Sequence, residues 1–227
     1  MDCKVEGVGN MKIYGPDSDF DKVMESVTKM VKEREIYMNY DQTWGQNTGE
    51  ETRKSWKDKY WSGFFEKYMS GNGLDIGYAG YIKDVHPVLP AATGIDLSYP
   101  GYDGRILPFP DESQDYVYSS HFLEHVTDYK NAIQEQFRVT NKGGHIIIVV
   151  PHRDLYEKKT ALPSRWNADH KRFYTSSSLL KEIEDSLPIN SYRIRHLLEN
   201  DTGHDYNDGP DVHGRWNYEI EVVLEKL

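Results

Sequence analysis

Residues 74–81 have the sequence LDIGYAGY, in which a short apolar strand candidate ends in an acidic residue and a glycine-rich turn. Small residues at positions 77, 79 and 80 let a ligand approach the backbone closely, and glycine readily adopts a positive φ. Nineteen residues after Gly77, a second strand candidate ends in Asp96. A carboxylate in that place can accept hydrogen bonds from two ribose hydroxyls. The pattern therefore predicts a nucleoside-containing ligand at the ends of two neighbouring strands.

The same turn argues against a dinucleotide as that ligand. A pyrophosphate site has the spacing G-x-G-x-x-G at the start of a helix, and this register is missing here. Asp75 would also repel a pyrophosphate, whereas its carboxylate suits a cationic sulfonium ligand that carries a free amino group. An oxidoreductase that uses NAD is therefore the disfavoured alternative.

Apolar stretches of four to seven residues alternate with helical periodicity from residue 73 onward, which is typical of a parallel sheet covered on both faces. Helices are expected around residues 129–137 and after Thr175, a residue suited to cap one. We predict a doubly wound, mostly parallel α/β sheet of about seven strands that ends in an antiparallel hairpin. The strand candidates are residues 73–76, 92–97, 116–119, 145–150, 192–198 and 218–224.

Residues 1–70 are predicted to form a helical N-terminal extension packed on a single domain that spans residues 1–227. Thr48 and Glu51 have the spacing of a capping box, which predicts the start of one of its helices. Aromatic residues then recur every three or four positions, as expected for a helix face packed on a core. These residues are Trp56, Tyr60, Trp61, Phe64, Phe65 and Tyr68.

The net charge and the cysteine content of the chain limit the partners and the covalent links that we expect. The chain has 227 residues and a formal net charge of −10, which disfavours long nucleic acids because phosphate backbones are repelled. Cys3 is the single cysteine, so an intrachain disulfide cannot form. Residues 1–10 are polar and the sequence shows no apolar stretch long enough to cross a bilayer. We therefore expect no signal peptide, and a cytoplasmic protein with a small-molecule substrate. A homodimer contact and a cover for the active site are both open roles for residues 1–70.

Residues 74–151 resemble the class I S-adenosylmethionine-dependent methyltransferases in the order and spacing of their motifs. Residues 103–111 resemble the segment that holds adenine, residues 115–120 the fourth strand, and residues 138–151 the following helix, turn and fifth strand. The sequence departs from the superfamily at Ala79 and Tyr81, where glycines are usual. The resemblance implies a Rossmann-like fold and S-adenosylmethionine bound by Asp75, Gly77, Tyr78, Ala79, Gly80, Asp96, Leu97, Asp103, Gly104, Ser119 and Ser120.

Residues 121–125, HFLEH, follow the fourth predicted strand directly and carry a cluster of metal-ligand types. On a helix, positions 121 and 125 lie one turn apart, so three side chains can converge. The same letters occur in inverted zinc peptidases, but their position after a parallel strand does not fit that class. Together with residues 169–175, DHKRFYT, they resemble the metal site of the small-RNA 3′-terminal 2′-O-methyltransferases. The resemblance implies metal ligation by His121, Glu124, His125 and His170.

Three imidazoles and one carboxylate suit Mn²⁺, Fe²⁺, Co²⁺ or Zn²⁺ better than Mg²⁺, which prefers oxygen ligands. An ion on a vicinal diol lowers the pKa of the attacking hydroxyl. We therefore predict O-methylation of a small polar acceptor, such as a carbohydrate or nucleotide-linked sugar, with His125 and His170 in catalytic roles. A metal-free site in which one histidine is the general base stays open.

Two alternative functions also stay open. In the first, the acceptor of the methyl group is an RNA 3′ end. In the second, the chain is a non-catalytic module that binds the cofactor. Arg165 and Trp166 are candidate substrate-binding residues, and a surface loop with one tucked tryptophan is their alternative interpretation.

Overall fold

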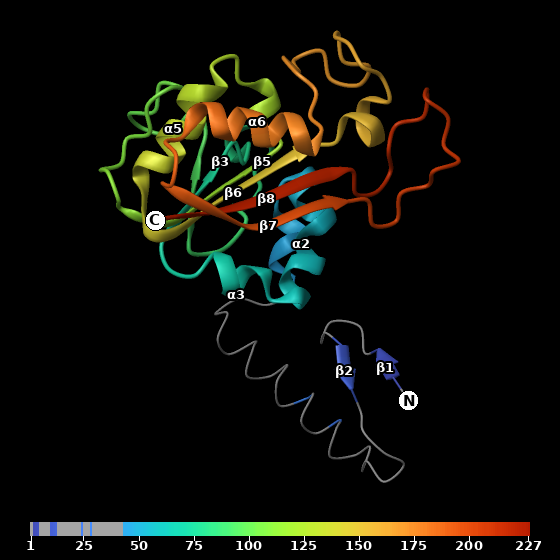
Figure 1. The fold of residues 1–227 in the computed structure, drawn as a ribbon, viewed down its shortest axis with the longest axis horizontal. Coiled ribbons are helices and arrows are strands. Elements are labelled where there is room, and N and C mark those ends of the chain that lie inside the picture. The colour runs from blue at the N-terminus through green and yellow to red at the C-terminus, as the bar shows by residue number, and fades with distance from the viewer. Residues whose placement is uncertain (1, 5–9, 13–23, 25–27, 29–42) are drawn as a thin grey trace.

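The computed structural model describes residues 2–4, 10–12, 24, 28 and 43–227. Its centre is a six-stranded sheet with the strand order β4-β3-β5-β6-β8-β7 (Figure 1). The strands are β3 (Gly73–Ile76), β4 (Ala92–Ile95), β5 (Gln114–Ser120), β6 (Thr140–Pro151), β7 (Tyr192–Asn200) and β8 (Glu219–Lys226).

Strands β3, β4, β5 and β6 are parallel, and β8 pairs antiparallel with both β6 and β7. The predicted mostly parallel α/β sheet with an antiparallel C-terminal pair is confirmed. Only β7 of that pair lies at the sheet edge, because β8 is inserted beside β6. The described sheet has six strands rather than about seven. Residues 97–113 contain no strand, since Pro100, Pro108 and Pro110 cannot donate to a ladder.

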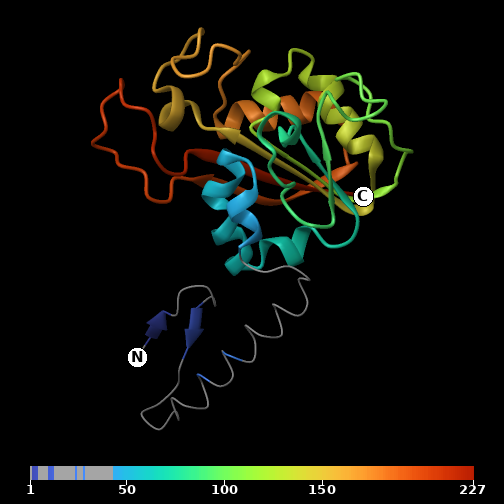
Figure 2. The same ribbon diagram turned by 180° about the vertical axis from the view of Figure 1, so that it is seen from behind.

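Helices cover both faces of the sheet (Figures 1 and 2). The side chains of β6 alternate, so that Ile147 and Val149 pack on one face while Ile146 and Ile148 pack on the other. Helices α2 (Glu50–Ser62) and α3 (Phe64–Tyr68) cover the first face, and α5 (Tyr129–Val139) and α6 (Ser176–Ser186) cover the second. The connection after β3 contains only the single turn α4 (Gly80–Lys83).

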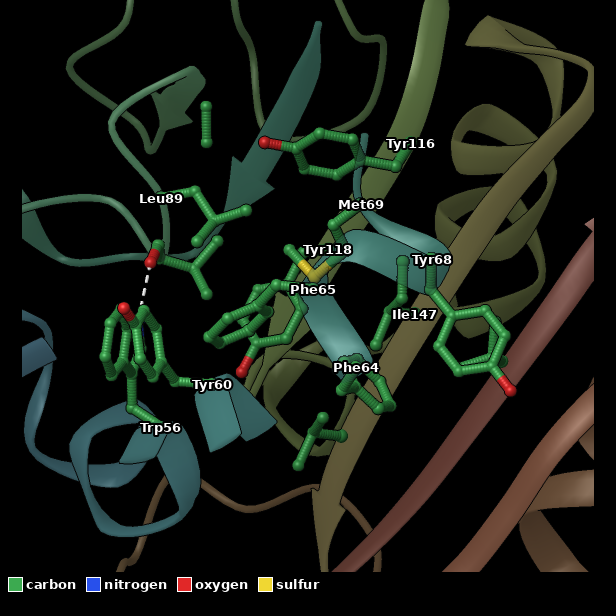
Figure 3. Close-up of a cluster of buried hydrophobic side chains, with 14 residues drawn as sticks. Trp56, Tyr60, Phe64, Phe65, Tyr68, Met69, Leu89, Tyr116, Tyr118 and Ile147 are labelled. Atoms are coloured by element: carbon green, nitrogen blue, oxygen red, sulfur yellow. Dashed lines mark hydrogen bonds between the residues drawn. The ribbon is translucent and has the colours of Figure 1, made fainter. Parts of the chain in front are cut away.

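The predicted aromatic stripe is confirmed as the packing face of α2 and α3 (Figure 3). Trp56 is buried, stacks on Tyr60 with ring centroids 5.3 Å apart, and donates its indole N–H to the Val88 carbonyl at 2.7 Å. Tyr116 and Tyr118 of β5 complete the cluster from the sheet side. Trp61 is only partly buried and packs at its margin.

The two predicted helix caps have different outcomes. Thr175 caps α6 by accepting from the Ser178 amide, and Ser178 completes the capping box. The predicted box at Thr48 and Glu51 is wrong, because the N-cap of α2 is Gly49 and the Thr48 hydroxyl donates to the Gly45 carbonyl. The Glu51 side chain is thereby left to face the sheet.

Much of the predicted extension over residues 1–70 lies outside the described residues. Within them, β1 (Asp2–Lys4) pairs with β2 (Asn10–Lys12), and residues 44–47 form the 3-10 turn η1 ahead of α2. Among the described helices, none has the length and apolar character required to span a lipid bilayer.

Lys59 of α2 is expected to be essential for stability. Its ammonium is buried 2.9 Å from Glu221 Oε1 and 3.7 Å from Glu219 Oε2, and these carboxylates raise the pKa of Lys59 although burial opposes this. Lys59→Met leaves two carboxylates buried without their cation, so it should lower the free energy of unfolding by about 3–5 kcal/mol. Urea denaturation measures this. The exposed Lys181→Met, a control, should leave the midpoint unchanged; a loss below about 1 kcal/mol for Lys59→Met would contradict the expectation.

Candidate active site

The carboxyl ends of β3, β4 and β5 meet at one edge of the sheet, and two cavities adjoin there. Cavity A has a volume of about 620 Å³ and cavity B a volume of about 410 Å³. Both are lined by Gly77, Ala79, His121 and His125. A ligand that fills cavity A therefore reaches the wall of cavity B.

The predicted cofactor-binding residues divide between the two cavities. Cavity A is lined by Gly77, Ala79, Asp96, Leu97 and Gly104, and cavity B by Asp75, Gly77, Tyr78, Ala79 and Ser120. Gly80, Asp103 and Ser119 line neither. Gly80 packs beneath the Tyr78 ring, where a Cβ would lie 2.0 Å from a ring carbon. Asp103 instead accepts hydrogen bonds from the amides of Arg105 and Ile106.

The backbone of the turn after β3 requires small residues. Gly77 has a φ of +80°, and a Cβ there would lie 2.9 Å from the Phe122 ring. Ala79, where the superfamily usually has glycine, also has a positive φ of 60°. The turn thus retains a left-handed conformation at a residue for which it is strained.

Three of the four predicted metal ligands come together. Glu124, His125 and His170 each offer a ligand atom, and these atoms lie within 4.8 Å of one another. Glu124 is fully buried, and neither of its carboxylate oxygens has a hydrogen-bond donor. A buried carboxylate without donors is costly unless a cation balances it. The chemistry of this group therefore fits a divalent cation. We call these three residues the His/Glu group.

His121, the fourth predicted ligand, lies beside the His/Glu group rather than in it. Its Nδ1 is 3.5 Å from Glu124 Oε1, and its Nε2 is 3.5 Å from Glu219 Oε1 and 3.8 Å from Glu51 Oε2. Burial favours neutral His121, but the carboxylates of Glu219, Glu124 and Glu51 together raise its pKa above the ordinary value. His121 is thus held between carboxylates on both sides of its ring.

The glutamates that α2 and β8 bring next to His121 were not predicted from the sequence. Glu51 lines cavity B, where it pairs with Lys54 and accepts a hydrogen bond from the Tyr218 hydroxyl at 2.7 Å. Glu219 is buried next to His121. The signal available was the alternation of glutamates with apolar residues over 219–222, but exposed strand faces have the same pattern.

Arg165 and Trp166, the predicted substrate residues, line neither cavity. Arg165 pairs with Asp211, and the Trp166 indole donates to the Tyr156 carbonyl at 2.8 Å. Arg165 thus joins the loop 158–172 to the polar insert 201–217, and the Trp166 ring packs on His213 of that insert with ring centroids 5.2 Å apart. Lys158 reinforces this junction by donating to the carbonyls of Asp208, Gly209 and Val212. Near this junction, Tyr156 and Asn167 line cavity B.

Asp75 lines cavity B and has a raised pKa. Burial raises the pKa of its carboxyl group to about 7, and a hydrogen bond from the Val88 amide, 2.6 Å from Oδ2, only partly offsets this. Asp75 is thus largely protonated in mildly acidic solution.

The sequence comparisons converge on methyltransferases. Residues 84–148 match the family model described as a methyltransferase domain. The chain is 38% identical over 81 residues to a demethylmenaquinone methyltransferase of Streptomyces griseus, which covers 36% of this chain and 32% of the relative. It is also 38% identical over 77 residues to the ajmaline N-methyltransferase of Rauvolfia serpentina, covering 33% and 26%. The chain thus spans a third or less of the length of these curated relatives.

The structural comparison agrees on the fold. A chain of the complex that contains the Trm112 methyltransferase activator of Haloferax volcanii aligns with 82% of this chain and 93% of its own length, at 15% identity and a TM-score of 0.50. The domain therefore shares the α/β fold of that chain, and residues 84–148 carry the sequence pattern of a methyltransferase domain. The comparisons give no support to the narrower resemblance to small-RNA enzymes.

The raised pKa of Asp75 makes a prediction about stability and pH. In the folded protein the Asp75 carboxyl keeps its proton up to about pH 7, whereas in the unfolded chain it releases the proton above about pH 4. The contribution of this proton to the free energy of unfolding is therefore fully present at low pH and is lost as the pH rises to about 7. Asp75→Asn lacks this dependence. Relative to the wild type, the variant should therefore gain on the order of 4 kcal/mol between pH 4 and pH 8.

Urea denaturation at several pH values measures this difference. Asp111→Asn, a substitution at an exposed aspartate, is the control. A stability difference between Asp75→Asn and the wild type that does not change with pH would contradict the assignment.

Proposed function

We propose that this protein is an S-adenosylmethionine-dependent O-methyltransferase whose acceptor is a small polar molecule, such as a carbohydrate or nucleotide-linked sugar. One observation carries the proposal: cavities A and B adjoin and share four residues, and the His/Glu group lies in the wall of cavity B. Such a pair of cavities accommodates a cofactor and an acceptor side by side, so that their reacting atoms meet at the shared wall.

Cavity A suits the nucleoside part of the cofactor. Asp96 is nearly buried in its wall, and the Oδ1 atom of Asp96 is anchored by the Ser98 amide and hydroxyl. A carboxylate held in this way is pre-positioned for the ribose hydroxyls. Gly77 and Gly104 keep the backbone close to the ligand. When bound, S-adenosylmethionine supplies an electrophilic methyl group on a sulfonium.

The His/Glu group supports a metal-assisted reaction at an oxygen. Two imidazoles and one carboxylate suit Mn²⁺, Fe²⁺, Co²⁺ or Zn²⁺ better than Mg²⁺. When bound, such an ion lowers the pKa of an acceptor hydroxyl and orients it. If His125 and His170 are ligands, His121 is the imidazole that remains on both cavity walls, where it can take up a proton. Without an ion, one of the three histidines acts as the general base.

The choice of oxygen rests on the His/Glu group and not on the relatives. The name of the plant relative specifies methylation of nitrogen, so similarity alone does not select the accepting atom. Against an RNA 3′ end as acceptor stand the net charge of −10 and the glutamates at positions 50 and 51 in the wall of cavity B. A small acceptor remains the better supported choice.

Asp96→Asn should weaken binding of S-adenosylhomocysteine about 10- to 100-fold, because a hydrogen bond to a charged group is worth about 1.5–3 kcal/mol. Isothermal titration calorimetry on the full chain measures the dissociation constant. Asp111→Asn changes an exposed aspartate that lines neither cavity and should bind as the wild type does. Equal affinity for Asp96→Asn and the wild type would refute the assignment of Asp96.

His170→Ala should abolish the binding of one metal ion per chain, because His170 belongs to the His/Glu group. The binding of S-adenosylhomocysteine should stay intact, because His170 lines cavity B and not cavity A. Elemental analysis and a thermal-shift titration on the same purified sample test both statements. His204→Ala, in the insert, is the matched control. Wild-type protein that binds the cofactor but neither carries nor responds to Mn²⁺ would remove the metal from the proposal and leave the methyltransferase assignment in place.

A further inference from the structure

Both histidines of the His/Glu group use the same ring nitrogen to contact a carboxylate outside the group. His170 Nδ1 lies 2.8 Å from Glu157 Oε1, and His125 Nδ1 lies 3.0 Å from Asp169 Oδ2. A carboxylate accepts a hydrogen bond from the N–H that faces it, so each contact favours the tautomer with hydrogen on Nδ1. The lone pair of Nε2 is then available, and His125 Nε2 lies 3.9 Å from Glu124 Oε1.

Glu157 is firmly held in the position from which it contacts His170. It is buried in the turn η3 (Arg153–Glu157), directly after β6. Its carboxylate accepts hydrogen bonds from the Ser164 hydroxyl at 2.7 Å and from the Arg165 amide at 3.1 Å. These donors come from the loop 158–172, seven and eight residues further along the chain. Glu157 therefore keeps its orientation whether or not His170 binds a ligand.

Asp169 is held less firmly than Glu157. Its side chain is 64% exposed, and its second oxygen accepts from Lys171 Nζ at 2.7 Å. His125 is itself partly exposed, whereas His170 is nearly buried. Water can thus replace the Asp169 contact more easily than the Glu157 contact, and the two carboxylates should differ in importance.

His121 lacks a comparable arrangement. Both of its ring nitrogens face carboxylates, Glu124 on one side and Glu219 with Glu51 on the other. Its backbone φ of +50° turns the chain between β5 and η2 (Leu123–His125), so positions 121 and 125 do not share a helical turn. His121 therefore does not present a free nitrogen alongside those of His125 and His170.

We propose that Glu157 and Asp169 are positioning residues that fix the tautomer and direction of His170 and His125, and so define a metal centre with three protein ligands, Glu124, His125 and His170. This inference rests on the metal-binding part of the proposed function. Carboxylates behind ligating histidines increase the basicity of the imidazole and reduce its rotation, and their loss costs about 10- to 100-fold in metal affinity.

The test uses the full chain and Co²⁺ as the probe. Glu157→Gln should weaken Co²⁺ binding about 10- to 100-fold in isothermal titration calorimetry, and Asp169→Asn should weaken it less. Glu199→Gln is the matched control, since Glu199 faces a histidine remote from both cavities, with His152 Nε2 3.4 Å away. Affinity for S-adenosylhomocysteine should be equal in all four proteins, which also shows that each variant is folded.

A second measurement separates positioning from a general structural role. In long-range ¹H–¹⁵N spectra of the metal-free chain, the wild-type His170 should carry its hydrogen on Nδ1, and Glu157→Gln should shift part of the population to Nε2–H. Asp169→Asn provides the same test on His125 if Glu157→Gln fails to fold. Unchanged tautomers and unchanged Co²⁺ affinity in the variants would overturn the inference.

The outcomes also distinguish this inference from the proposed function. A wild-type chain that binds S-adenosylhomocysteine but no Co²⁺ overturns the metal centre and the positioning roles while the cofactor site stands. A chain that binds Co²⁺ but no S-adenosylhomocysteine overturns the methyltransferase function and leaves the positioning roles supported by the variants.

Discussion

A series of buried charged groups connects α2, β8 and the end of β5. Lys59 of α2 contacts Glu219 of β8, Glu219 contacts His121 at the end of β5, and His121 contacts Glu124. Burying carboxylates is costly, and in this chain of contacts Lys59 lies next to Glu219 and His121 lies between Glu219 and Glu124. These contacts therefore couple α2, the parallel core and β8 electrostatically next to cavity B.

The parts of the site that depend on local sequence were predictable. Gly77 and Asp96 follow strands, and their places in the wall of cavity A depend on backbone geometry and on the convergence of strand ends. Glu219 was not predictable in this way. Glutamates that alternate with apolar residues normally mark a solvated strand face, and only the packing of α2 with Lys59 over that face makes Glu219 an interior residue.

One other difference has an equally specific cause. The expected convergence of His121 with His125 assumed one helical turn, but His121 has a positive φ and residues 123–125 form a 3-10 turn. The residue types were identified correctly, and the local backbone determined where their side chains lie.

The junction between the loop 158–172 and the insert 201–217 has a consequence for how such proteins diverge. Lys158 contacts the insert through backbone carbonyls, which every amino acid possesses. Substitutions in the insert can therefore accumulate without loosening this anchor. Tyr156 and Asn167 line cavity B and not cavity A, so changes near this junction can alter cavity B while the lining of cavity A stays the same.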